Sequence, residues 1–352
     1  MNDYIAEYHR KIINGDIIVG QWIRMLYDMI VSGIESGDYI FDKAKASTVI
    51  EWIEAHCYHT EGPLAPQPFI LALWQKAAVS VIYGIVDKEG KRIFREVLFV
   101  MARKNGKSLL ASALVRYEWY NGGFGARIYC VAPKLDQTAI IYDSVWQQTL
   151  LEPEYQEFKE TIRSSIKYHE RKTIDDTSLP KHRQTDLFIA SENSVVKKLA
   201  FSDRKSDGFN PSLCVCDEVA AWEGDKGLKQ YEVLKSGMGA RPEGILLSCT
   251  TSGYVNESIY DELIKRSTRF LLGDSKEKRL LPFLYVIDDL DKWDDMDELR
   301  KSSSRSGSPQ ALSTTLAGSH ASEEFCFTQH IFVMNSILRE SEPSATAISS
   351  WM

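Results

Sequence analysis

The stretch that decides the fold is residues 95–108, which read REVLFVMARKNGKS. An apolar, strand-like run comes first, and an amphipathic helical pattern follows the Gly-Lys-Ser sequence. A strand, a tight turn and a helix in this order are typical of a phosphate-binding loop, in which backbone N–H groups face a nucleotide's phosphates. We expect Gly106 to close the turn, Lys107 to contact the β- and γ-phosphates, and Ser108 to ligate Mg²⁺. Met101 stands where the first glycine is usual, so a solvated, lysine-rich helix start is the alternative interpretation.

The alternation of strand-like and helical patterns after residue 93 predicts an α/β fold. The strand candidates carry Val, Ile, Leu and Cys on both faces, which indicates a buried, largely parallel sheet covered by helices. Together with the phosphate loop, this pattern predicts a P-loop NTPase of the type with an additional strand, preceded by an N-terminal helical region. Expected strands are 95–101, 126–132, 186–190, 195–200, 212–216, 244–250 and 281–287; expected helices are 107–120, 135–149, 226–237 and 256–270.

Changes in composition divide the chain into four regions. Residues 1–62 carry apolar side chains at helical spacing, and residues 63–275 are expected to form the P-loop domain. Residues 276–300 are expected to be a linker or the start of a second domain. The serine-rich residues 301–352 keep neither a helical nor a strand period and predict a poorly ordered tail. Within the P-loop domain, the polar residues 151–185 predict an irregular insertion over the sheet.

Composition limits the classes of protein to consider. The 352 residues include 44% hydrophobic and 26% charged residues, enough apolar material for a packed core. A net charge of −7 gives no overall nucleic-acid signature, so any contact with DNA must be local. The six cysteines form no C-x-x-C pair and are expected to be buried thiols in a reducing cytoplasm. We expect a soluble intracellular protein, because neither a signal peptide nor an 18-residue apolar run is present.

Two further apolar runs end in polar residues that suit nucleotide chemistry. Residues 211–218 end in Asp217 and Glu218; Asp217 is expected to hold Mg²⁺, and Glu218 to polarise the water that attacks the γ-phosphate. A solvated strand end is the alternative interpretation. Residues 244–253 end in hydroxyl side chains, of which Thr250 and Thr251 are expected to contact the γ-phosphate or the attacking water. Here the alternative is a plain turn between a strand and a loop.

Basic residues near the phosphate loop suggest roles in charge stabilisation. Arg103 is close enough in sequence to neutralise charge that develops in the transition state. Lys104 and Asn105 complete the loop, although Lys104 could simply be solvated. Arg241 lies in a glycine-rich stretch and could act as an arginine finger toward a neighbouring subunit, or be an ordinary surface arginine.

A tryptophan and a glutamine about 30 residues before the phosphate loop are candidates for contact with the base. The amide of Gln75 can pair with N6 and N7 of adenine, as glutamine does when it reads adenine in DNA. Trp74 could support the base, but packing in the core is the favoured interpretation of this residue.

With these runs assembled, the chain resembles the large subunit of the terminase of tailed bacteriophages, the motor that pumps DNA into a procapsid. The resemblance covers residues 45–290, and the Arg-Lys-Asn-Gly-Lys-Ser form without a first glycine is typical of that family. It rests on residues 73–75, 94–97, 103–108, 132–134 with Gln137, 207–211, 217–218, 236–242 and 250–253.

The resemblance implies an ATPase that uses ATP and Mg²⁺ to translocate double-stranded DNA. Such proteins assemble as a ring, usually a pentamer, on the portal protein at the procapsid vertex in the host cytoplasm, and a small terminase subunit delivers the DNA. The resemblance assigns to Arg103 the role of the family's phosphate-loop arginine. It assigns to residues 250–252 the role of the family's coupling motif. Family members also carry a nuclease domain with clustered aspartates, whereas no aspartate follows Asp297 here, so we expect no working nuclease.

A basic stretch between residues 163 and 205 is a candidate surface for DNA phosphates, with an ordinary solvated insertion as the alternative. Two other functions remain open: a helicase-like DNA-remodelling ATPase, and an inactive prophage remnant. The basic residues are Arg163, Lys167, Arg171, Lys172, Lys181, Arg183, Lys197, Lys198, Arg204 and Lys205.

Overall fold

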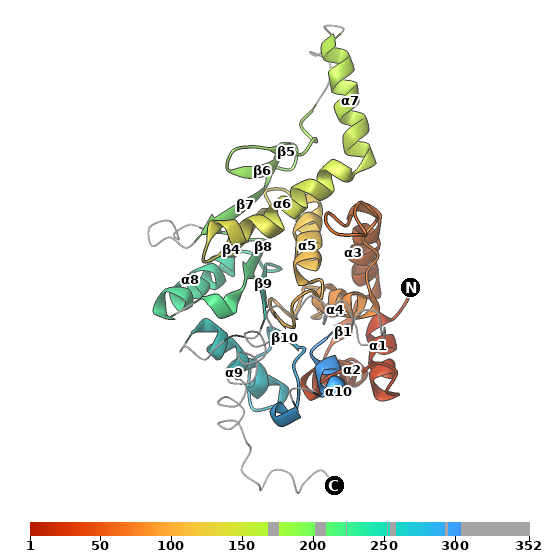
Figure 1. Cartoon of the computed structure of the whole chain (residues 1–352), viewed down its shortest axis with the longest axis vertical. Helices are drawn as coiled ribbons and strands as arrows, with labels where there is room; N and C mark the ends of the chain where they lie inside the picture. The colour runs from red at the N-terminus through yellow and green to blue at the C-terminus, as the bar shows by residue number, and fades with distance from the viewer. Residues whose placement is uncertain are drawn as a thin grey trace, which may run out of the picture.

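A computed structural model describes residues 1–167, 176–200, 209–222, 224–251, 253, 258–292 and 295–303, and in this part of the chain eight strands form one sheet (Figure 1). The spatial order is β10-β3-β9-β8-β4-β7-β6-β5. All neighbours from β10 to β7 are parallel, whereas β6 and β5 add as antiparallel strands. The strands are β3 (Glu96–Val100), β4 (Arg127–Ala132), β5 (Lys181–His182), β6 (Asp186–Ile189), β7 (Ser194–Ala200), β8 (Leu213–Asp217), β9 (Ile245–Thr250) and β10 (Leu280–Leu284).

The strand order decides which helices share a face of the sheet. The chain crosses from β3 to β4 in one direction through α5 (Lys107–Asn121). It crosses from β8 through β9 to β10 in the other direction, through α8 (Gly224–Gly237) and α9 (Ile259–Leu271). Right-handed crossovers therefore place α8 and α9 on the face opposite α5. Because α6 (Leu135–Leu151) packs beside α5 on β4 and β7, helices cover both faces, which confirms the predicted fold class.

The N-terminal region is helical, as its apolar spacing predicts. Ile5, Tyr8 and Ile12 form the buried stripe of the first helix, and α2 packs on β10 and α9. None of the described helices is both long enough and apolar enough to cross a lipid bilayer. The helices are α1 (Tyr4–Ile13), α2 (Gln21–Ser36), α3 (Lys43–His56) and α4 (Leu73–Gly84), with a short antiparallel pair, β1 (Ile40–Phe41) and β2 (Ile85–Val86).

The prediction of an irregular insertion at 151–185 is wrong for the first half of this range. A helix, α7 (Pro153–Lys167), extends away from the body of the molecule there (Figure 1). Proline suits the first helical position, because its missing N–H would have no partner there. The preceding residue, Glu152, is buried, forms an ion pair with Arg116 of α5 and a hydrogen bond with His56 of α3, and so fixes the base of the helix.

The sheet also extends beyond the predicted end of the P-loop domain at residue 275. β10 pairs in parallel register with β3, so the expected linker at 276–300 begins with a strand of this sheet. A short helix, α10 (Met296–Lys301), follows it. The predicted serine-rich tail, apart from residues 301–303, lies outside the described residues.

Candidate functional site

Three strands bring the predicted nucleotide residues to one edge of the sheet. β9 lies between β3 and β8 and is parallel to both, with Val100 opposite Thr250 and Asp217 opposite Cys249. The phosphate loop follows β3, Glu218 follows β8, and Thr251 follows β9. Since the carboxyl ends of parallel strands meet at one edge, residues that are far apart in sequence become neighbours. Ligands of open α/β sheets bind at this edge.

The backbone of the phosphate loop explains why methionine is tolerated where glycine is usual. Lys104 (φ 61°) and Gly106 (φ 84°) are the loop residues with left-handed backbone conformations, and Met101 is not among them. Met101 is instead completely buried, and its N–H donates to the carbonyl of Thr250 at 3.2 Å. The residue at position 101 therefore continues the strand and packs in the core, which an apolar side chain does better than glycine.

Buried polar contacts fix the shape of this loop. Asn105 is 3% exposed, and its Nδ2 donates to the carbonyl oxygens of Ala102 and Arg103 at 3.0 and 3.3 Å. Ser303, which follows α10, donates its hydroxyl to Asn105 Oδ1 at 3.0 Å. Asn105 therefore shapes the loop from within. The first N–H groups of α5 point out of the helix end that begins at Lys107, which is the usual arrangement for holding an anion.

The charged groups of the three motifs influence one another. The Lys107 ammonium donates to the Met101 carbonyl at 2.8 Å, and burial lowers its pKa while Glu218 and Asp217 act in the opposite direction. Burial and the neighbouring Glu218 raise the pKa of Asp217 to about 6, against the opposing effect of Lys107. One ammonium and two carboxylates, about 110 positions apart in sequence, thus influence one another electrostatically at this edge.

The turn after β8 has an unusual backbone that the sequence did not reveal. Glu218 adopts φ 49° and ψ 50°, a left-handed conformation that is rare for a side chain of this kind. The indole N–H of Trp222 donates to the carbonyl of Asp217 at 2.9 Å. The Ala220 N–H donates to Thr250 Oγ1 at 3.2 Å, which ties this turn to the end of β9. Trp222 was missed because one tryptophan just after a strand gives no signal of a backbone contact.

The other predicted residues of this edge differ in exposure. Arg103, Lys104 and Ser108 are exposed beside the loop and are accessible to a ligand. Thr250 is fully buried, and its hydroxyl donates to the carbonyl of Thr251 at 2.7 Å. A phosphate contact by Thr250 would require this hydroxyl to change its partners. Ser252, which continues the predicted coupling motif, lies outside the described residues.

The two residues predicted to contact the base lie at the start of α4. Trp74 is 3% exposed and packs edge-on against Phe99 and Tyr285, so it has the core packing role that the sequence analysis favoured over contact with a base. A buried ring with aromatic neighbours offers no face to a base. Gln75 is also buried, and its Oε1 accepts from the Ala72 N–H at 2.9 Å, which caps the helix.

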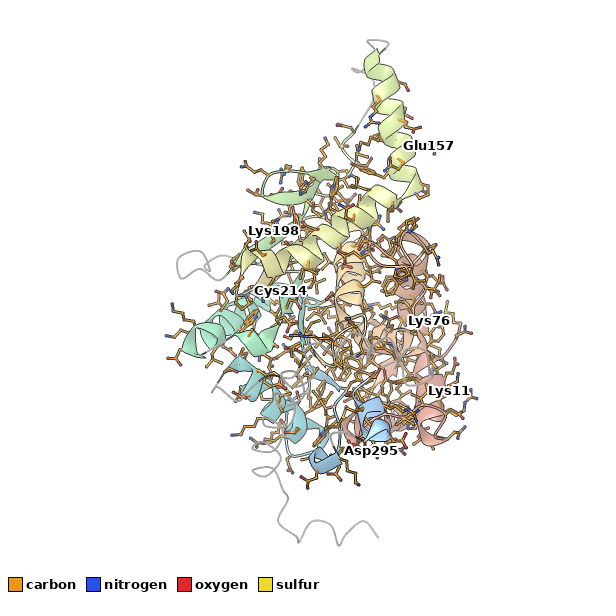
Figure 2. All side chains as sticks on the ribbon, in the orientation of Figure 1. Lys11, Lys76, Glu157, Lys198, Cys214 and Asp295 are labelled. Carbon is orange, nitrogen blue, oxygen red and sulfur yellow. The ribbon has the colours of Figure 1, made fainter. Side chains whose placement is uncertain are left out.

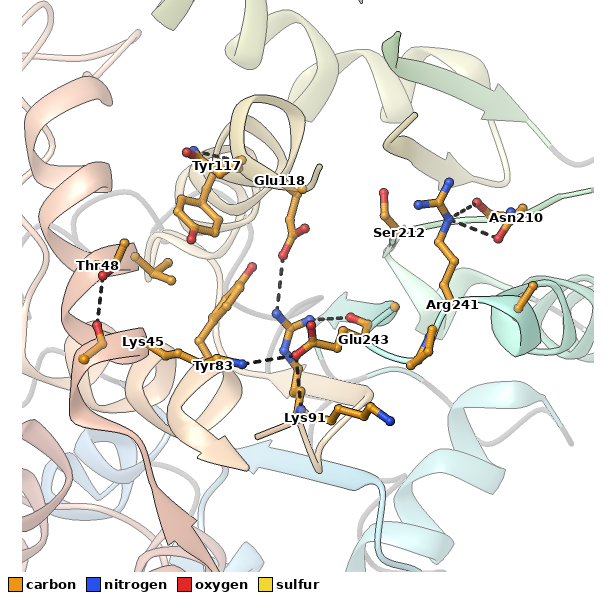
Figure 3. A pocket seen from close by; sticks show the side chains of 18 residues that line it. Lys45, Thr48, Tyr83, Lys91, Tyr117, Glu118, Asn210, Ser212, Arg241 and Glu243 are labelled. Carbon is orange, nitrogen blue, oxygen red and sulfur yellow. Dashed lines mark hydrogen bonds and ion pairs between the residues drawn. The ribbon is translucent and has the colours of Figure 1, made fainter. Parts of the chain in front are cut away.

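Arg241 lies at the opposite edge of the sheet, before β9 begins. Its Nε donates to Asn210 (Figure 3), and its Nη2 donates to the carbonyl of Gly125 at 2.7 Å. It lines a cavity of about 780 Å³ between α3 and the amino ends of the strands, together with Glu118 and Glu243. Arg241 therefore lies away from the phosphate loop of its own chain. The predicted role in trans would require these contacts to be exchanged for contacts with a neighbouring subunit.

Comparison with known proteins agrees with this geometry. The chain is 25% identical over 265 residues to the terminase large subunit of Lactococcus phage SK1, and 24% identical over 265 residues to that of Lactococcus phage p2. In both cases the match covers 74% of this chain but only 45% of the relative, so the chain spans less than half the length of these relatives.

A solved structure shares the fold. The large terminase of bacteriophage HK97 superposes with a TM-score of 0.57 at 18% identity, over 82% of this chain and 55% of that one. The family model of the terminase large subunit ATPase domain matches residues 73–269, which span all three motifs at the carboxyl edge and more than half of the chain. On this evidence, the chain belongs to the terminase large subunit ATPase domain family.

Proposed function

We propose that this protein hydrolyses ATP at the carboxyl edge of its sheet and uses the energy to move double-stranded viral DNA into a procapsid. The observation that carries the proposal is the electrostatic cluster of Lys107, Asp217 and Glu218 beside a helix N-terminus. Membership of the terminase family supports the coupling to DNA. Each residue of the cluster has the chemistry that phosphoryl transfer requires.

The residues of this edge fit a Mg²⁺ ion. Ser108 offers an exposed hydroxyl and Asp217 a carboxylate, both oxygen ligands that Mg²⁺ prefers. Burial and, after it, the adjacent carboxylate of Glu218 raise the pKa of Asp217 although Lys107 opposes them, so a divalent cation is complementary to the site. When bound with ATP, Mg²⁺ neutralises charge on the β- and γ-phosphates. Ser108 and Asp217 are therefore the residues that we assign to it.

The remaining side chains have separate roles in hydrolysis. Lys107 exchanges its bond to the Met101 carbonyl for the phosphate oxygens, and the N–H groups at the start of α5 bind the same phosphates. Glu218 orients a water molecule toward the γ-phosphate and accepts its proton. Arg103, exposed at the loop, neutralises charge that develops during transfer. Gln75 contacts adenine through its amide nitrogen, because its amide oxygen already accepts the bond from Ala72.

A hydrolysis assay with different nucleic acids tests the proposal. We expect the protein to release phosphate from ATP, and duplex DNA to increase the rate several-fold more than single strands or forks do. Greater stimulation by forks would favour a helicase-like enzyme, and absence of hydrolysis would indicate a remnant. A Glu218→Gln variant purified in the same way controls for contaminating ATPases.

The partners that we propose follow from the family. The protein would act in the host cytoplasm as a ring, five-fold in the family, docked on a portal protein. A small terminase subunit would deliver the DNA. Belonging to the terminase large subunit family supports this assignment. In such a ring, Arg241 remains a candidate finger toward the next subunit, provided that it leaves Asn210 and Gly125.

Within the described part of the basic stretch, two neighbouring lysines of β7 have no ion pair. Lys181 and Arg183 form ion pairs with Asp176 and Asp186, whereas within the described residues neither Lys197 nor Lys198 has a carboxylate within ion-pair distance; Arg171, Lys172, Arg204 and Lys205 lie outside those residues. Neighbouring residues of a strand point to opposite faces, so these two lysines do not form one flat patch. The ammonium of Lys198, a residue labelled in Figure 2, lies 4.9 Å from the centre of the Tyr142 ring of α6. We therefore propose Lys197 as the stronger phosphate contact.

Replacing Lys197 by alanine is expected to weaken binding of duplex DNA several-fold. The slope of log affinity against log salt should become shallower by about 0.9, because one phosphate contact releases about that many counterions. A smaller change is expected for Lys198→Ala. Fluorescence anisotropy with a labelled duplex, at a series of salt concentrations, measures both quantities. Lys229→Ala on α8 removes an exposed positive charge elsewhere, so equal affinities for the Lys197→Ala and Lys229→Ala variants would contradict the proposed contact.

A further inference from the structure

The backbone of Glu218 is held in an unfavourable conformation at the point where hydrolysis is proposed to occur. A non-glycine residue at φ 49° lies in the left-handed region, where its side chain crowds the backbone and the conformation carries a cost. Such a conformation persists only when surrounding contacts enforce it. The contacts that enforce this conformation therefore also determine how the Glu218 carboxylate is oriented.

Several hydrogen bonds hold this turn, among them one from the Ala221 N–H to the Glu218 carbonyl at 2.8 Å. Two others fix the backbone on either side of Glu218. Before it, the peptide that joins Asp217 to Glu218 is oriented by the indole N–H of Trp222, which donates to the Asp217 carbonyl at 2.9 Å. After it, the N–H of Ala220 donates to Thr250 Oγ1 at 3.2 Å. Rotation of Glu218 about φ would turn the peptide before it and break the bond from the indole. The bond from Trp222 thus acts directly on the angle that is strained.

The tryptophan is itself fixed in place. Trp222 is completely buried, and its ring meets that of Tyr231 of α8 edge-on, with centroids 6.4 Å apart. Gly227 lies so close to the backbone of Trp222 that no Cβ would fit there. Because this packing fixes the side chain, the indole N–H stays in place and holds the Asp217 carbonyl in its orientation.

We propose that Trp222 is a positioning residue for Glu218: its indole N–H keeps the turn in the left-handed conformation that directs the carboxylate toward the attacking water. This inference rests on the proposed ATPase function. It predicts that loss of the N–H slows the chemical step and leaves nucleotide binding intact, because Lys107 and the start of α5 do not depend on this bond.

The test uses Trp222→Phe, which keeps an aromatic ring and removes the donor. We expect kcat for ATP hydrolysis to fall about tenfold to a hundredfold, as small misplacements of catalytic groups do, with KM changed less than about twofold. Trp22→Phe is the matched control, because Trp22 is also buried and its indole N–H meets no acceptor in the described part of the chain. Both variants should lose similar thermal stability, and only Trp222→Phe should lose kcat.

A double-mutant cycle separates positioning from general damage. In Glu218→Gln the carboxylate is already absent, so adding Trp222→Phe should cost little further activity. The inference would be overturned if the fold losses in kcat of the two single variants multiplied in the double variant. It would also be overturned if Trp222→Phe left kcat unchanged, with or without a raised KM. If Trp222→Phe does not fold, β-(3-benzothienyl)alanine at position 222 removes the N–H at nearly constant shape. A wild-type protein without ATPase activity would refute the proposed function, whereas an active wild type with a fully active Trp222→Phe refutes only the inference.

Discussion

Glu218→Gln is expected to reduce ATP hydrolysis by at least about a hundredfold while ATP still binds, because loss of a general base typically costs a factor of 10²–10⁴. The amide has the size of the carboxylate and keeps the backbone of the turn, but it cannot accept a proton from water. Binding should persist, since it depends on Lys107 and on the N–H groups of the phosphate loop. Removing one negative charge beside the site also favours a bound triphosphate, so affinity should rise slightly.

Two measurements are needed to test this variant. Phosphate release gives kcat, and fluorescence titration with a nucleotide analogue gives the dissociation constant. Glu232→Gln is the control, because Glu232 is exposed on α8 and its replacement makes the same chemical change away from the site. If Glu218→Gln kept more than about half of the wild-type rate, the general base would have to be another residue and our assignment of the site would be wrong.

The features that the sequence predicted are those carried by local signals. The phosphate loop combines a strand, a turn and a helix within 14 residues, and each part has its own pattern. The strands were visible because residues buried on both faces form continuous apolar runs, as in β8 and β9. Convergence of Lys107 with Asp217 and Glu218 followed from one rule: parallel strands end at the same edge.

The features that were missed depend on contacts between distant segments. α7 was overlooked because its polar composition concealed a helical spacing of apolar residues, starting with Tyr155 and Phe158. The sequence left contact with a base open for Trp74, because a sequence does not show that Phe99 and Tyr285 enclose this ring. Trp222 was missed because its partner is a backbone carbonyl, and any residue type supplies one.

A buried ion cluster at the amino end of β3 also escaped the sequence analysis, and it leads to a large expected effect on stability. Glu96, 4% exposed, accepts two bonds from Arg266 of α9 at 2.7 and 2.9 Å. Lys235 of α8 lies 2.9 Å from it, and the Tyr231 hydroxyl donates to it at 2.9 Å. This one carboxylate therefore connects two helices of the same layer to a central strand.

Glu96→Ala is expected to lower the free energy of unfolding by about 3 kcal/mol, because it leaves the largely buried Arg266 with Glu277 as its remaining carboxylate and takes the carboxylate from Lys235. Chemical denaturation followed by circular dichroism measures this change. Glu277→Gln is the control, since Glu277 contacts the same Arg266 at 2.7 Å but is more exposed and does not touch Lys235. A loss for Glu96→Ala no larger than that for Glu277→Gln would contradict a central role for this cluster.

The same cluster predicts how stability depends on pH. Burial alone would raise the pKa of Glu96, but its bonds to Arg266 and Lys235 outweigh burial and hold the pKa below the usual 4.5. A carboxylate with a depressed pKa in the folded state stabilises the fold fully above its unfolded pKa, and this contribution disappears as pH falls through the folded value. The difference in unfolding free energy between wild type and Glu96→Gln should therefore be largest near neutral pH and shrink below pH 4.5. A difference that stayed constant across this range would mean that the ionised form of Glu96 is not what holds α8 and α9 to the sheet.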